Sequence, residues 1–460
     1  MKILYKIPSR NRFPLLFDMI EKIHELTELP DYRILVSLDA DDIADQSYET
    51  RVRIEEMRNE ITVFKTGKSL SKIDAVNRDI NDFEYDWDII VVLSDDHKIM
   101  KKGFDKIISD FFLSRFPDTD GCPNFWDGNR DDDLITLAVM GRKYYHRFDY
   151  VYHPDYQSFY CDNEMTEVAF LLNKYAKYKE CIIQHKHPSF HKDIPFDSLY
   201  QRNENFWQED YNTLEDRKNR LFDLPKNKII SYCLWGEDNK YIQGALQNVD
   251  LAKEIYPEFI TKFYVDESIS IETLSALAKK GALIERYRGF IGWKLMLYRF
   301  LPIEHPLTEI MLSRDTDSRP SARERKCVDE FIASDKKFHT IHDHPYHNLP
   351  ILGGMWAAKR GIIDNISDLI AENIGKYPNK YQCDQTFLAE IILPIVENDI
   401  LVHSDYVFYP HRHISPIDMP RENYEFIGSV YDENNNRYED YHEILKKYLD
   451  VNSTSKLPRS

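Results

Sequence analysis

Short apolar runs alternate with longer amphipathic segments in the first half of the chain. Each run is rich in branched side chains and bounded by polar or turn-forming residues, which is typical of strands. The longer segments carry apolar residues at helical spacing. The predicted elements are strands at 3–7, 33–38, 61–64 and 88–93 and helices at 13–26 and 70–80. Strands separated by such helices predict βαβ units in a mainly parallel sheet.

The same order of elements begins again after a polar stretch, 201–227, which we interpret as a terminal helix and a linker. The predicted elements are strands at 228–234, 260–265 and 309–312 and helices at 239–255, 271–280 and 293–300. The two halves share this order more than they share sequence. The pattern therefore predicts an α/β protein with two mainly parallel domains in tandem, at 1–222 and 226–450, followed by a tail at 451–460.

Length and composition agree with two globular cores. The chain has 460 residues, which is long for one compact core, so two or three domains are expected. Hydrophobic residues make up 42% and charged residues 30%, and 30 Tyr and 25 Phe supply ample apolar surface.

The net charge and the cysteine content indicate which binding partners and which cellular compartment to expect. The formal net charge of −18 disfavours non-specific binding to phosphate backbones or anionic membranes. The six cysteines form no CxxC pair, so neither a zinc site nor a disulfide framework is indicated. The start of the chain turns polar too early for a signal peptide, and no apolar stretch has the length of a membrane helix. We expect a cytoplasmic protein, in the host cytoplasm if it is viral.

Acidic motifs follow a central strand in each half. Ser94-Asp95-Asp96-His97 follows the strand at 88–93, and Asp315-Thr316-Asp317 follows the strand at 309–312. Ligands of open α/β sheets bind at the carboxyl ends of the strands. Paired carboxylates there can hold a divalent cation, Mn²⁺ or Mg²⁺, that bridges two phosphates. A histidine ligand, His97, suits manganese better than magnesium.

Pro8-Ser9-Arg10-Asn11-Arg12 follows the first predicted strand. This segment resembles the opening loop of family 2 glycosyltransferases, which meets the nucleotide in that family. The resemblance implies that Asp39, Asp41 and Asp95 contact the uracil or ribose. Lys72 and Asn77 match a basic-then-Asn segment on the next helix. Pro8, Ser9, Arg10 and Arg12 are the expected nucleotide-sugar ligands of the loop, and Asp96 with His97 is the expected metal pair.

Cys161-Asp162-Asn163-Glu164 precedes a predicted helix and resembles the catalytic-base segment of the same family. Asp162 or Glu164 would deprotonate an acceptor hydroxyl. The alternative is a structural one, because acidic residues favour the first turn of any helix. His187, or the nearby His185, would supply a late metal ligand.

Five motifs stand out in the second half: Arg299-Phe300-Leu301-Pro302, Ser313-Arg314-Asp315-Thr316-Asp317-Ser318-Arg319, Arg323-Glu324, Asp343-His344-Pro345-Tyr346-His347 and Gly353-Gly354-Met355-Trp356. Together they resemble a family of glycosyltransferase-like proteins found in bacterial and viral polysaccharide gene sets. The resemblance implies a GT-A fold with Asp315 and Asp317 as metal ligands, Asp384 as base, and His403 or His411 completing the metal site. The expected nucleotide-sugar ligands are Trp235, Asp266, Lys294, Arg299 and Arg314.

Together these features predict a metal-dependent, bifunctional glycosyltransferase with two GT-A domains. The expected donor is a UDP-sugar rather than a GDP-sugar, the acceptor is a glycan, and the first domain inverts the anomeric centre. One alternative is a glycosyltransferase acting on modified DNA bases. Another is that one domain only binds, and the first, with His97 in its motif, is the candidate. A non-catalytic scaffold and a nucleotidyltransferase rank lower, the latter because no Gly-rich basic loop follows the first strand.

Overall fold

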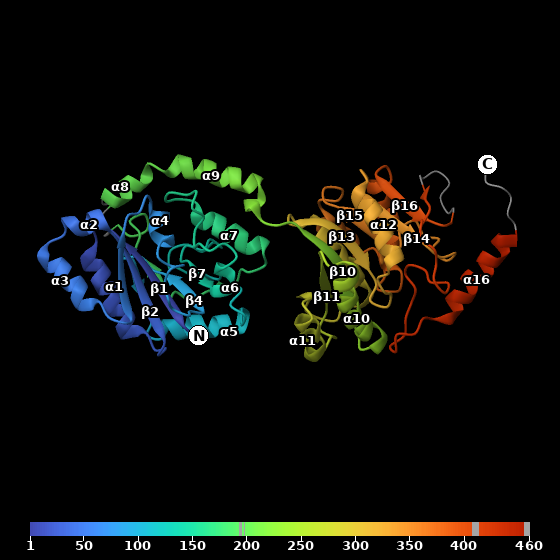
Figure 1. The fold of residues 1–460 in the computed structure, drawn as a ribbon, viewed down its shortest axis with the longest axis horizontal. Coiled ribbons are helices and arrows are strands. Elements are labelled where there is room, and N and C mark those ends of the chain that lie inside the picture. Colours follow the sequence, from blue (N-terminus) through green and yellow to red (C-terminus); the bar gives the residue numbers. More distant parts are fainter. Residues whose placement is uncertain (193–195, 197, 407–413, 455–460) are drawn as a thin grey trace. The chain divides into compact units, whose positions relative to one another are not determined.

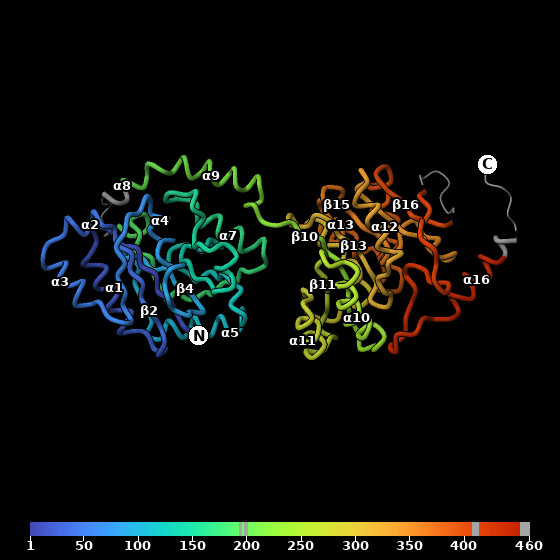
Figure 2. The backbone as a smooth tube through the Cα atoms, viewed as in Figure 1, coloured from blue at the N-terminus to red at the C-terminus, as the bar shows by residue number. Residues whose placement is uncertain are grey.

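The computed structural model describes residues 1–192, 196, 198–406 and 414–454, and the chain divides into two compact units, Met1–Asp223 and Leu224–Ser460. Figure 1 and Figure 2 trace the chain through both units. Within the described ranges, no helix combines the length and the apolar character needed to cross a bilayer.

The first unit is built on a sheet of five strands in the order β3-β2-β1-β4-β7. The strands are β1 (Ile3–Ser9), β2 (Tyr32–Asp39), β3 (Thr62–Gly67), β4 (Ile89–Val92) and β7 (Val139–Gly141). The strands β1, β2, β3 and β4 run parallel to one another, and β7 runs antiparallel to β4. The carboxyl ends of β1, β2 and β4 therefore meet at one edge.

Helices lie around this sheet (Figure 1). They are α1 (Phe13–Leu26), α2 (Ala40–Asp45), α3 (Tyr48–Met57), α4 (Lys72–Asn77), α5 (Phe104–Arg115), α6 (Arg142–Tyr145), α7 (Cys161–Leu171), α8 (Ser198–Glu204), α9 (Trp207–Asn219) and the short η1 (Leu221–Asp223). Helix α1 carries Leu16, Ile20 and Ile23 at helical spacing, and they share one buried core with Tyr5 of β1. Two short strand pairs complete the unit: β5 (His97–Ile99) with β9 (Ile183–His185), and β6 (Asn124–Phe125) with β8 (Lys177–Tyr178).

The second unit is built on a sheet of eight strands in the order β12-β11-β10-β13-β15-β14-β16-β17. The strands are β10 (Asn227–Leu234), β11 (Phe259–Val265), β12 (Leu283–Arg286), β13 (Thr308–Arg314), β14 (Phe338–His342), β15 (Met355–Lys359), β16 (Ile400–Ser404) and β17 (Ile414–Ser415). Only β15 runs antiparallel to its neighbours, β13 and β14, among these described strands. The helices are α10 (Asn239–Ile255), α11 (Ile271–Lys279), η2 (Gly292–Glu304), α12 (Ala322–Ala333), α13 (Ile366–Asn373), α14 (Cys383–Phe387), η3 (Leu388–Ile392), α15 (Leu393–Val396) and α16 (Glu439–Thr454).

The predicted α/β class with two mainly parallel sheets is confirmed. Two details differ. The predicted helix at 293–300 is instead the 3-10 helix η2, which contains Pro302, a residue that cannot donate the backbone hydrogen bond of a regular α-helix. The stretch at 201–227, interpreted as one helix and a linker, forms most of α8 and all of α9.

Candidate functional site

A pocket of about 120 Å³ opens at the carboxyl ends of β1, β2 and β4 in the first unit. It is lined by Pro8, Ser9, Arg10, Arg12, Ser37, Asp39, Ser69, Ser71, Lys72, Ala75, Ser94, Asp95, Asp96, Arg202, Asn203 and Phe206. Eight of the sixteen were predicted from strand ends and the opening loop. Four of the lining residues are basic and three are acidic, so the pocket can accept an anionic ligand.

Arg10 holds the opening loop to the end of β2 and the start of α2 through two ion pairs. Arg10 Nη1 donates to Asp39 Oδ2 at 2.8 Å, and Arg10 Nη2 donates to Asp41 Oδ2 at 2.6 Å. The hydrogen bond from Arg10 lowers the pKa of Asp41 to about 2. Asp41 is exposed and is not among the lining residues, so the structure brings Asp39 into the pocket and leaves Asp41 outside it as a partner of Arg10.

Asp95 is fixed at the end of β4 by two donors. Ser9 Oγ donates to Asp95 Oδ2 at 2.9 Å, and Arg12 Nη1 donates to Asp95 Oδ1 at 3.1 Å. Burial raises the pKa of Asp95 to about 6, although Arg12 opposes the shift. Arg12 Nη1 also lies 3.5 Å from Asp96 Oδ2. The opening loop and the acidic motif thus form one connected polar network.

Asp96, His97 and His185 form a candidate metal centre. Their ligand atoms all lie within 4.8 Å of one another, and in the part of the chain that the structure describes no other trio of His, Cys, Asp or Glu does so. The antiparallel pairing of β5 and β9 sets His97 opposite His185. Burial and the neighbouring His185 lower the pKa of His97 to about 3, so its imidazole is neutral at pH 7. Two nitrogens and one carboxylate fit Mn²⁺ better than Mg²⁺.

His187 lies beside this centre rather than in it. Its ring is 5.4 Å from that of His185, and it is not part of the trio. The structure therefore favours His185 over the predicted His187, because strand pairing brings His185 opposite His97.

Asp162 lies in the first turn of α7, after Tyr160 in the left-handed backbone region at φ 61°. Its side chain is half-buried, and its Oδ1 accepts a hydrogen bond from the backbone N–H of Asn163 at 3.0 Å. Burial raises the pKa of Asp162, and the pocket residue Lys72 opposes that shift. A half-buried carboxylate near the pocket with a raised pKa has the properties of a general base.

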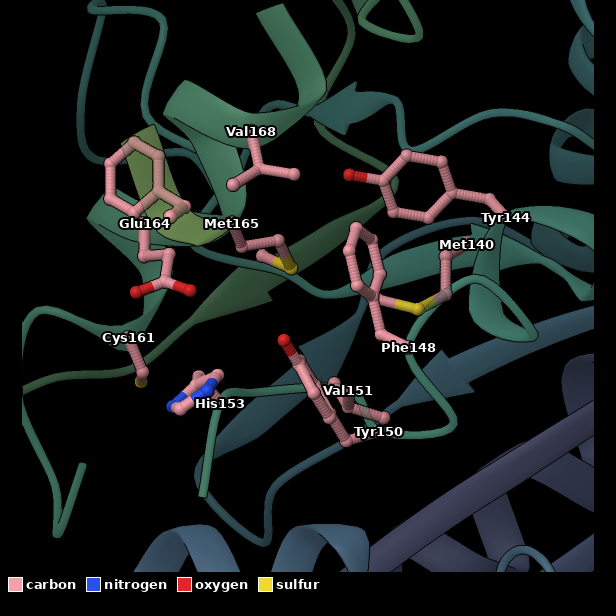
Figure 3. A pocket seen from close by; sticks show the side chains of 11 residues that line it. Met140, Tyr144, Phe148, Tyr150, Val151, His153, Cys161, Glu164, Met165 and Val168 are labelled. Carbon is pink, nitrogen blue, oxygen red and sulfur yellow. The ribbon is translucent and has the colours of Figure 1, made fainter. Parts of the chain in front are cut away.

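Glu164 does not fit that role. Arg217 of α9 donates to both of its carboxylate oxygens, at 2.5 and 2.7 Å, and Tyr156 Oη donates at 2.9 Å. Glu164 faces a small internal cavity of about 20 Å³, among Met140, Tyr150 and Val168 (Figure 3). The Glu164 carboxylate is thus buried in an ion pair with Arg217 and is not part of the lining of the strand-end pocket.

Asn77 is structural rather than a ligand. At the end of α4 its Nδ2 donates to Tyr152 O at 2.7 Å, while its Oδ1 accepts from Val151 N at 2.9 Å. Both ends of its amide therefore hold the segment at 151–152. Lys72, at the start of the same helix, does line the pocket.

A larger pocket of about 340 Å³ opens at the ends of β10 and β13 in the second unit. It is lined by Cys233, Leu234, Trp235, Gly236, Glu237, Asp238, Tyr241, Trp293, Met296, Arg299, Asp315, Thr316, Asp317, Ser318, Gly353, Tyr381, Asp384, Gln385, Gly428 and Val430. Among the predicted residues it gathers Trp235, Arg299, Asp315, Asp317 and Asp384.

Three other predicted ligands of the second unit, Arg314, Asp266 and Lys294, are not part of the pocket lining. Arg314 is buried, and it donates to Glu324 Oε1 at 2.5 Å and to Trp356 O at 2.9 Å. Asp266 accepts from the backbone N–H of Ile291 at 2.8 Å.

Lys294 lies on η2, where its backbone N–H donates to Asn379 Oδ1 at 3.1 Å. The polar atoms of Arg314 and Asp266 thus hold neighbouring segments of the chain, and neither residue is part of the pocket lining.

His403, a predicted metal ligand, contacts two other side chains. Its Nδ1 and Nε2 lie 2.8 Å from His339 Nε2 and from Glu330 Oε2, respectively. It is 1% exposed, and it does not group with Asp315 and Asp317. Its alternative, His411, lies outside the described residues.

Several lining residues were not predicted. In the first unit they include Arg202 and Asn203 of α8, and Phe206, which follows this helix. The sequence signal was the pair Phe206-Trp207 in an otherwise polar stretch. In the second unit Trp293 and Tyr381 were missed, because aromatic residues in such segments most often form core.

Similarity to known proteins is found among solved structures. No family model and no curated protein matches the chain. Similar solved structures include a mannosyltransferase from Pyrobaculum calidifontis in complex with GDP-Man and Mn²⁺, at 14% identity and a TM-score of 0.34, covering 40% of this chain and 56% of that chain. They include S. aureus TarS 1–349 in complex with UDP, at 13% identity and a TM-score of 0.32, covering 40% and 60%.

A further similar structure is a glycosyltransferase involved in the glycosylation of the major capsid of PBCV-1, at 19% identity and a TM-score of 0.28, covering 39% of this chain and 82% of that chain. The chain thus spans less than two thirds of the length of the first relatives it matches.

Proposed function

We propose that the first unit is a metal-dependent glycosyltransferase with a GT-A fold, which transfers a sugar from a nucleotide-sugar donor. The observation that carries this proposal is the trio Asp96, His97 and His185 beside a pocket at the strand ends. These residues would hold Mn²⁺, which neutralises the phosphates of the leaving nucleotide when it is bound.

The basic residues of the pocket suit the donor's diphosphate. Arg10, Arg12 and Lys72 line the pocket, and guanidinium groups bind phosphate oxygens in pairs. Asp39, at the end of β2, is placed to accept hydrogen bonds from a ribose or a base. The donor is a UDP-sugar in preference to a GDP-sugar, and the acceptor is a glycan.

Asp162 is the proposed base of the transfer. It takes the proton of the acceptor hydroxyl as that oxygen bonds to the anomeric carbon, while the bond from this carbon to the phosphate oxygen breaks. The displacement is a single in-line step, so the anomeric configuration inverts. Retained configuration in the product, observed by NMR, would contradict this part of the proposal.

The test is nucleoside diphosphate release from UDP-glucose, UDP-GlcNAc and GDP-mannose, with Mn²⁺ and with EDTA. We expect release with Mn²⁺ that Asp96→Asn lowers by about 100-fold or more. The matched control is Asp110→Asn, an exposed carboxylate on α5. Release that is equal in EDTA, or unchanged in Asp96→Asn, would overturn the proposal.

A further inference from the structure

The acidic motif of the second unit already has protein cations as partners. Arg299 donates to Asp315 through Nη1 and to Asp384 Oδ2 through Nη2, the latter at 2.7 Å. Lys240 Nζ lies 2.9 Å from Asp317 Oδ2. Both carboxylates that the sequence assigns to a metal are thus neutralised by the chain itself.

Arg299 is fixed in this position. Its side chain is 2% exposed, and a buried guanidinium is tolerated only with carboxylates around it. A Cβ added at Gly353 would lie 2.1 Å from Asp384 Oδ2, and one at Gly354 would lie 2.1 Å from Asp315 Oδ2. The two glycines therefore let both carboxylates pack against the backbone beside Arg299.

Lys240 is held from two sides. Besides its contact with Asp317, its Nζ lies 4.7 Å from the ring centre of Tyr241 and 5.4 Å from that of Tyr438. Cation–π contacts of this length favour an ammonium group in place. The ammonium occupies the position beside Asp317 that a divalent cation would need.

No third ligand completes a metal set there. Within the described ranges, the Asp315 and Asp317 carboxylates do not group with another His, Cys, Asp or Glu, whereas the trio of the first unit does. The donor set of the second unit therefore does not fit the divalent cation that its motif implies.

The walls of the second pocket also oppose an anionic ligand. Five lining residues are acidic, namely Glu237, Asp238, Asp315, Asp317 and Asp384, and only Arg299 is basic. The first pocket has four basic and three acidic residues. Lys240 offsets one further negative charge, at Asp317, but acidic groups still outnumber basic ones, so the pocket disfavours a nucleoside diphosphate when no cation is bound.

An aromatic wall suits an uncharged sugar instead. The ring of Trp293 lies 5.5 Å from that of Trp235 and 5.5 Å from that of Tyr381. These rings offer an apolar surface to the C–H face of a sugar, and the neighbouring carboxylates can accept hydrogen bonds from its hydroxyl groups.

We propose that the second unit binds an uncharged carbohydrate without a divalent cation, with Lys240 and Arg299 in place of the ion. The proposal is independent of the transferase activity of the first unit. It assigns the binding role to the second unit, whereas the sequence favoured the first unit for that role because His97 stands in its motif.

The first test counts bound Mn²⁺ by electron paramagnetic resonance on the full chain. We expect one bound Mn²⁺ in the wild type and in Asp317→Asn, and none in Asp96→Asn. Asp110→Asn, an exposed carboxylate on α5, is the matched control. A Mn²⁺ that remains in Asp96→Asn and disappears with Asp317→Asn would overturn the proposal. Absence of Mn²⁺ from the wild type would count against the first unit's function alone.

The second test is saturation-transfer NMR with cellobiose, chitobiose, lactose and mannobiose in EDTA. We expect at least one to bind, and Tyr381→Ala to weaken it about tenfold. Tyr381 is 64% exposed, so the variant should fold, and Tyr346→Ala, at 58% exposed and outside the pocket lining, is the control. Binding of none of the four, or equal loss in both variants, would overturn the carbohydrate assignment.

Discussion

Two carboxylates in the first turn of α7 show how neighbours decide the role of a residue. Asp162 is half-buried near the pocket residue Lys72. Glu164, two positions on, is buried against Arg217. The sequence indicated a functional role for this segment but left Asp162 and Glu164 as equal candidates for the base. Arg217 is distant in the chain, so no local pattern predicts its ion pair with Glu164.

Replacing Asp162 by Asn should lower the transfer rate by about 10²- to 10⁴-fold and leave donor binding intact, because only the base is lost. Burial raises the pKa of Asp162, and the carboxylate is active when deprotonated. The rate should therefore fall as the pH falls through that raised pKa, above the usual range of an aspartate. The measurement is the pH profile of kcat, and an Asp162→Asn enzyme with the wild-type profile would contradict the assignment.

Replacing Gly353 by Ala tests how tightly Arg299 packs with Asp315 and Asp384. Replacement by Ala should destabilise the second unit by about 1–3 kcal/mol, because the new Cβ would meet Asp384 and Arg299 at 2.1 and 2.6 Å. Urea denaturation measures the change. Gly375→Ala is the matched control, since nothing lies within 4 Å of its added Cβ. Equal stability of the two variants would show that the cluster is loosely packed.

At the scale of elements, the sequence could predict which motifs lie together because they follow the carboxyl ends of predicted strands. Periodicity located β1, β2, β4, β10 and β13, and parallel pairing then brings the motifs after them to one edge. The short strands β5 and β9 carry too few residues for a periodic signal. Their pairing sets His185 opposite His97. The sequence alone could therefore not decide whether His185 or His187 is the third candidate ligand.

The contact of α7 with α9 depends on a buried ion pair. Arg217→Met should destabilise the first unit by about 3–5 kcal/mol, because it leaves the Glu164 carboxylate buried without its cation. The double variant Glu164→Leu with Arg217→Met should regain most of this loss, since the unpaired charge is gone. Calorimetric unfolding is the measurement. A single variant as stable as the wild type would contradict the role given to the pair.

At the scale of the whole molecule, two units carry pockets at equivalent sheet edges with opposite charge balance. The pocket of the first is basic and lies beside a histidine-containing ligand set, and the pocket of the second is acidic, aromatic and already neutralised at its motif. The repeated strand order was visible in the sequence. The difference between the pockets could not be predicted from the sequence, because it depends on contacts between distant segments, such as Lys240 with Asp317 and Arg299 with Asp384.

A chain that carries a donor site and a glycan-binding site would hold its acceptor glycan at a raised local concentration for the transfer reaction.

The most direct test of this account is calorimetric titration of UDP and GDP in the presence of Mn²⁺. The account predicts one nucleotide site per chain, which disappears in EDTA and in Asp96→Asn and persists in Asp317→Asn. Two sites, or a single site that survives Asp96→Asn and is lost in Asp317→Asn, would contradict the assignment of donor binding to the first unit.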